Sequence, residues 1–129
     1  MNPLLLNGFE DMSADDVIAH IKEDYIKGEK GELENIAKID GFDLLIAYES
    51  VGDWGCDSSS FFLFKRKCDG VLFENHASHC SCYGFEGQFE PEETTVEYLK
   101  SDRFLFFTGG YDDDSEKNEK LVNNFIAKM

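Results

Sequence analysis

Apolar residues between Ser13 and Gly28 recur with the period of a helix, at Val17, Ile18, Ile21 and Tyr25. Ser13 is a suitable N-cap, and Asp16 follows it three residues later, as in a capping box. Gly28 is a typical helix terminator. The pattern therefore predicts a helix over residues 13–28. We expect the preceding residues, 1–12, to form a loose arm.

Short apolar runs in the middle of the chain indicate strands rather than helices. The runs cover residues 42–48, 60–66, 71–75 and 104–107. Asp69-Gly70 lies between the second and third runs and predicts a tight hairpin turn. Tight hairpins favour antiparallel pairing, so we expect a mostly antiparallel sheet.

Three further segments read as helices. A short one is predicted within residues 29–41, and another begins at Pro91 with Val96 and Leu99 on its inner face. The last helix follows residues 112–115 and has an apolar stripe at Leu121, Val122, Phe125, Ile126 and Met129. Together these elements predict an α+β fold: a small, mostly antiparallel sheet with flanking helices. A length of 129 residues fits a single domain, residues 1–129.

The charge of the chain narrows its possible partners. The net charge is −15, because 27 acidic residues face 12 lysines and arginines. Such a surface repels nucleic acid and anionic membranes, so we expect no direct nucleic-acid binding and no membrane association. It suits a protein that binds a basic partner, although acidity also serves solubility alone. The sequence shows no export signal, which predicts a cytoplasmic location and cysteines that are thiols or metal ligands.

The chemistry of the chain is concentrated between residues 76 and 82. His76, His79, Cys80 and Cys82 lie there, in a chain with three histidines and four cysteines. Structural zinc is held by four ligands of these types. On an extended backbone Cys80 and Cys82 point to the same face, and a turn at Ser78 would bring in His79. We therefore predict a structural zinc ion at this cluster.

The predicted hairpin supplies the fourth ligand. A three-residue loop with a left-handed Gly70 places Cys56 opposite Cys82. A two-residue turn places Cys56 opposite Tyr83 and pairs Lys65 with Glu74. Either register leaves Cys68 far away, as a free thiol at the turn.

The predicted zinc ligands are Cys56, His79, Cys80 and Cys82. Asp53 is the alternative to Cys56, and His76 is the alternative to His79. It is also possible to read all of these as ordinary core thiols and polar residues. His20 stands alone on the first helix and is predicted to be a partly exposed residue rather than a ligand.

An enzymatic role finds less support in the sequence. A catalytic zinc needs an open coordination position and a general base, for which Glu86 or Asp53 would be candidates. However, the chain has no His-Glu-x-x-His motif and no phosphate-binding glycine loop. We therefore predict that the protein is not an enzyme and keep a small zinc hydrolase as the weaker alternative.

The segment that starts at the cluster is similar to a known block. It reads HCSCYGFEGQFEPEET, from His79 to Thr94. This block resembles one carried by a family of small acidic phage and prophage proteins. The whole chain resembles zinc-containing anti-CRISPR proteins of the type II-A class.

The resemblance implies a protein made in the cytoplasm of a bacterial host. It would bind the type II-A CRISPR RNA-guided nuclease and prevent loading of target DNA, without turnover. It supports His79, Cys80 and Cys82 as ligands, whereas Cys56 falls outside the shared block. The alternative is a zinc-stabilised phage protein that binds another basic host defence protein. Acidic clusters at residues 90–97 and 112–119 are the surfaces expected to meet such a partner.

Overall fold

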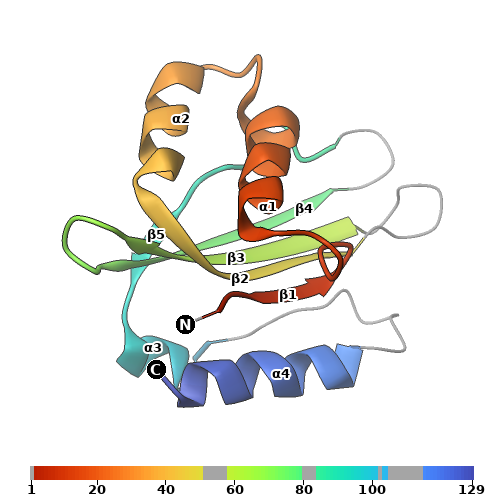
Figure 1. Cartoon of the computed structure of the whole chain (residues 1–129), viewed down its shortest axis with the longest axis vertical. Coiled ribbons are helices and arrows are strands. Elements are labelled where there is room, and N and C mark those ends of the chain that lie inside the picture. The colour runs from red at the N-terminus through yellow and green to blue at the C-terminus, as the bar shows by residue number, and fades with distance from the viewer. Residues whose placement is uncertain (1, 51–57, 80–83, 102, 105–114) are drawn as a thin grey trace.

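The computed structural model describes residues 2–50, 58–79, 84–101, 103–104 and 115–129. Its centre is a five-stranded sheet with the order β1-β2-β3-β4-β5 (Figure 1). The strands are β1 (Leu4–Asn7), β2 (Phe42–Ser50), β3 (Ser58–Arg66), β4 (Leu72–His79) and β5 (Glu92–Thr94). β1 runs parallel to β2, and the other neighbours are antiparallel. The α+β class is thus confirmed, with a mixed sheet that is mostly antiparallel.

Helices cover both faces of this sheet. On one face lie α1 (Ala14–Ile21), its π-helical continuation η1 (Lys22–Ile26) and α2 (Glu32–Asp40). On the other face lie α3 (Val96–Leu99) and α4 (Ser115–Ala127), so that the molecule has three layers (Figure 1). The predicted capping box is present, because the Ser13 side chain accepts a hydrogen bond from the Asp16 amide and Asp16 returns one.

The apolar core is divided by the sheet into two parts. β3 is buried on both faces, which explains its continuous run of large apolar residues. Phe62 and Phe64 pack under α1 and η1, while Phe61 and Leu63 pack toward α4. Among the described helices, none has the length and apolar character needed to cross a membrane.

Residues 1–12 are not a loose arm, as the sequence had suggested. They contain β1, whose Leu4 pairs with Ile46 and whose Leu6 pairs with Tyr48. Leu6 is buried in the core on the α4 side. The strand forms because the exposed edge of β2 offers it backbone partners and apolar cover at once.

The β3–β4 register differs from both predicted alternatives. Lys65 pairs with Leu72 rather than with Glu74, and at the other end Ser58 pairs with His79. The turn itself explains the difference. Gly70 is left-handed, with φ of 76°, and its amide donates to the carbonyl of Arg66 at 2.7 Å.

The Asp69 side chain stabilises this longer turn. Its carboxylate binds Arg66 through Nε and Nη2, at 2.9 and 2.6 Å, and also accepts from the Val71 amide. These bonds hold the pKa of Asp69 down at about 2. Cys68 in the same turn is an exposed free thiol, as predicted.

The segment after Pro91 begins as a strand and not as a helix. Glu92 and Glu93 pair with β4, and the helix starts only at Val96. Thr95 caps it, accepting a hydrogen bond from the Tyr98 amide. Of the predicted strand 104–107, Phe104 is described and belongs to no strand; residues 105–107 lie outside the described part. The last helix, α4, is confirmed.

Candidate functional site

Of the predicted zinc ligands, the structure describes the backbone of His79. His79 is the last residue of β4, and its backbone pairs with Ser58 at the start of β3. Cys56, Cys80 and Cys82, like the alternative Asp53, lie outside the described residues. β3 begins and β4 ends at the same end of the sheet. Within the described part of the chain, no group of three or more His, Cys, Asp or Glu residues is placed to hold a metal ion. The zinc site remains a prediction.

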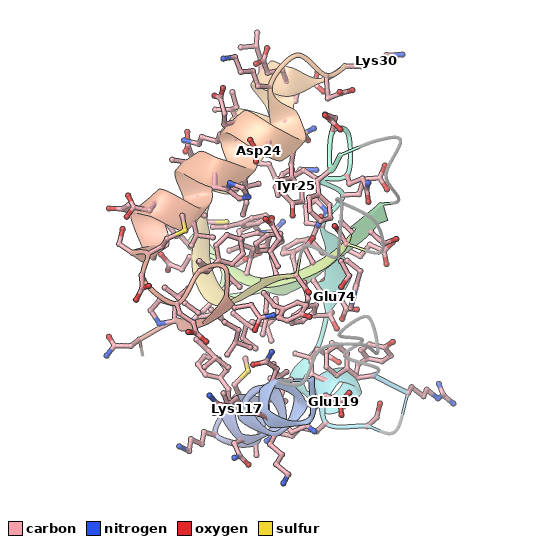
Figure 2. All side chains as sticks on the ribbon, turned by 90° about the vertical axis from the view of Figure 1, so that its right-hand side faces the viewer. Asp24, Tyr25, Lys30, Glu74, Lys117 and Glu119 are labelled. Carbon is pink, nitrogen blue, oxygen red and sulfur yellow. The ribbon has the colours of Figure 1, made fainter. Side chains whose placement is uncertain are left out.

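His76, the alternative ligand, contacts a carboxylate. Its Nε2 lies 2.9 Å from Oε1 of Glu74, and its ring packs against Phe61 and Phe104. Glu74 is buried on the side of the sheet that faces α4 (Figure 2). Burial raises the pKa of Glu74, but the adjacent His76 and Thr94 together hold it below its ordinary value. The imidazole of His76 thus gives a buried carboxylate oxygen a hydrogen-bond partner.

A second histidine–carboxylate cluster is present that the sequence did not predict. His20 on α1 and Tyr25 on η1 both contact the same oxygen of Glu49, at the end of β2. His20 Nε2 lies 2.9 Å from Glu49 Oε2, and the Tyr25 hydroxyl donates to that atom at 2.8 Å. His20 Nδ1 lies 3.3 Å from Asp24. The cluster connects the helical layer to the sheet, toward which Tyr25 points in Figure 2.

The charges of this cluster act on one another. The hydrogen bond to Glu49 is the main reason that the pKa of His20 is raised, against the opposing effect of burial. Burial, reinforced by the negative charge of Glu49, raises the pKa of Tyr25. Tyr25 also stacks on Phe85, with ring centroids 4.9 Å apart. These contacts give the partly buried Glu49 carboxylate its hydrogen-bond partners. The cluster therefore has a structural role.

No local signal in the sequence could have revealed it. His20 and Glu49 are 29 residues apart and belong to different elements.

The exposed acidic residues form a candidate interface along β5 and α3. We call this the acidic edge, defined by Glu90, Glu92, Glu93 and Glu97, all of them exposed. β5 is the last strand of the described sheet, and its Glu92 and Glu93 pair with Glu74 and Phe73 of β4. Among the described residues, no Lys or Arg forms an ion pair with these four carboxylates.

The second predicted acidic cluster, residues 112–119, is described only in part. Glu119 is exposed on α4 (Figure 2). Asp112, Asp113 and Asp114 lie outside the described residues.

Comparison with known proteins finds no relative of this chain. No family model, no curated protein and no solved structure matches the chain.

Proposed function

We propose that this protein is a non-catalytic inhibitor that binds the type II-A CRISPR RNA-guided nuclease and prevents target-DNA loading. It would act in the cytoplasm of a bacterial host, as a phage or prophage product. The observation that carries the proposal is the excess of acidic residues, −15 in net charge, with an acidic edge on β5 and α3 that forms no ion pair among the described residues. The sequence block from His79 to Thr94 supports the choice of partner.

The negative charge of this protein complements the positive charge of such a nuclease. RNA-guided nucleases hold nucleic acid in a positively charged channel. An acidic protein is attracted to such a surface over long range and at a rate that falls with ionic strength. The carboxylates of Glu92 and Glu93 project from a strand whose backbone is already fixed by β4, so little ordering entropy is lost on binding.

Zinc would have a structural role in this proposal. Three thiolates and an imidazole, from Cys56, Cys80, Cys82 and His79, form a donor set that suits a tetrahedral zinc ion. His79 ends β4 beside Ser58, and the segment from Gly84 leads into the acidic edge. Phe85 and Phe89 anchor that segment in the core. Metal bound at this end would hold the start of the segment in place.

The contacts around Asn75 support this role for the segment. Its side-chain amide donates to the Gln88 carbonyl at 3.1 Å, and its oxygen accepts from the Glu90 amide. Gln88 in turn accepts from the Ser78 amide at 2.9 Å. The acidic edge therefore begins from a backbone that β4 holds on both sides of Phe89.

The proposal is tested by a pull-down with the purified nuclease and its guide RNA. One variant neutralises the acidic edge: Glu90→Gln, Glu92→Gln, Glu93→Gln and Glu97→Gln. The matched control carries the same net charge, with exposed acids changed elsewhere: Glu10→Gln, Asp11→Asn, Asp15→Asn and Glu34→Gln. We expect the first variant to lose binding at least tenfold more than the control, a difference of about 1.4 kcal/mol.

Two results would count against the proposal. If the wild-type protein forms no complex at either low or high salt, the nuclease is not its partner. If both variants lose binding equally, the acidic edge is not the contact surface.

A further inference from the structure

The surface of this acidic protein contains a cavity with a basic rim. The cavity, of about 410 Å³, lies between the end of α2 and the β3–β4 turn. Its apolar lining includes Ala37, Phe42 and Phe73. The charged residues that line it are Lys38, Arg66 and Lys67, and among the described lining residues no acid is present. That composition is unexpected in a chain where acids outnumber bases 27 to 12.

The apolar floor of the cavity is held rigidly. The Phe42 ring lies 5.1 Å from Phe73 and 5.1 Å from Phe64, in stacked arrangements. The Arg66 guanidinium lies over the Phe73 ring at 5.0 Å. Lys67 joins the turn to the end of α2, because its amide donates to the Gly41 carbonyl at 2.9 Å. A ligand would therefore meet a floor that is already formed.

The positive charges at the rim are unequally compensated. Arg66 is paired with Asp69 and also interacts with Glu93. Asp40, the other nearby acid, is paired with Lys22. Lys67 Nζ donates to the Asp40 carbonyl at 3.4 Å.

Lys38 and Lys67 are the less compensated charges, although Lys38 also lines a neighbouring cavity that contains Glu29, Glu90 and Glu92. Within the described part of the chain, neither forms an ion pair with a carboxylate. Two ammonium groups thus stand beside an apolar floor without a carboxylate partner.

An exposed leucine extends the apolar surface. Leu33 is 82% exposed and lies one helical turn before Ala37 on α2. The apolar surface therefore continues from the cavity along the helix. That shape exceeds what a small molecule in the cavity would cover, and it matches a peptide segment with contacts beyond its anchor.

We propose that this cavity and Leu33 form a docking site for an acidic segment of a partner protein. The segment would place one aromatic side chain on Phe42 and Phe73. Flanking carboxylates would pair with Lys38 and Lys67, and a further apolar residue would cover Leu33. Buried aromatic anchors supply most of the affinity of such contacts, and charged pairs at the rim supply specificity. The charges of this site are positive, whereas those of the acidic edge are negative. The two surfaces would therefore contact different proteins, or different regions of one protein.

The site is tested with peptides and the full-length, isotope-labelled protein. The probe is the blocked peptide Gly-Asp-Glu-Phe-Asp-Glu-Gly, titrated while backbone amide resonances are recorded. We expect shifts confined to residues 33–42 and 65–73. Replacing the four acids of the peptide by lysine should abolish the shifts, and replacing its Phe by Ala should weaken binding roughly tenfold.

Charge reversal in the protein gives the matched test. Lys38→Glu with Lys67→Glu should lower the peptide affinity at least tenfold. Lys117→Glu with Lys128→Glu, two exposed positions on α4 and directly after it, should leave it unchanged. Leu33→Ala should reduce affinity severalfold for a peptide lengthened by one leucine, and have no effect on the short peptide.

Three outcomes would overturn the proposal. Shifts spread over the whole surface would show non-specific attraction. Equal losses in the two charge-reversal variants would show that the cavity is not the site. Phenylacetate binding as tightly as the peptide would assign the cavity to small aromatic acids instead.

Discussion

At the scale of single residues, the contacts of Glu49 connect the helical layer to the sheet. One oxygen of Glu49 receives both the Tyr25 hydroxyl and the imidazole of His20. The side chains of His20 and Glu49 are 24% and 13% exposed, so solvent only partly screens their charges. The contact should therefore contribute to stability in a way that depends on pH.

The raised pKa of His20 gives the direction of this dependence. The ordinary value is 6.5, and the pKa is higher in the folded protein, mainly through the bond to Glu49. The stabilisation is fully present below pH 6.5 and is lost as pH rises through the folded-state pKa. We expect His20→Gln to lower the free energy of unfolding by about 1–2 kcal/mol in acid and by less in alkali.

Urea denaturation of both proteins between about pH 5.5 and pH 8.5 measures this difference. A loss that stays the same across that range would contradict an ionised His20–Glu49 pair.

At the scale of elements, the contact between α4 and β1 contains a polar pair of which one member is buried. Asn118 Nδ2 donates to Asn7 Oδ1 at 2.9 Å, and Asn118 is 2% exposed. Asn118→Ala removes the donor of this part-buried bond, so we expect a loss of about 0.5–1.5 kcal/mol. Asn124→Ala, at an exposed position of the same helix, should change little. Thermal unfolding compares the two, and equal melting temperatures would show that the pair contributes nothing.

Elements with a strong local period were predictable, and elements created by their partners were not. The helix from Ser13, the three central strands and α4 each show their pattern within one segment. β1 has consecutive leucines without a period, and its parallel partner lies far along the chain. β5 has glutamates where a strand usually has apolar residues, and only pairing with β4 makes it a strand.

The contacts of the candidate site were likewise not predictable from local sequence patterns. The β3–β4 register depends on how Asp69 binds Arg66, which turn patterns do not report. The cluster at Glu49 joins three elements and has no motif. In contrast, the predicted ligands Cys80 and Cys82 lie two residues apart in the sequence, and their assignment as ligands stays a prediction.

For the whole molecule, the zinc hypothesis makes a prediction about stability. The binding energy of a structural metal is folding energy, so chelation should lower the melting temperature strongly. Cys82→Ser should have a similar effect, whereas Cys68→Ser, at an exposed free thiol, should not. Elemental analysis should find one zinc ion per chain. Equal melting temperatures with and without chelator would contradict a structural zinc.

The contact between Asn7 and Asn118 also has a consequence for synthesis in the cell. The two residues are 111 positions apart, so the amino-terminal strand leaves the ribosome long before its last partner exists. The β2–β3–β4 meander forms from nearby segments, while β1 must wait for a distant closure. Until α4 has been made, the apolar side chain of Leu6 and its neighbours lack their helical cover. A nascent chain of this protein therefore exposes these apolar side chains to proteases and chaperones until α4 has left the ribosome.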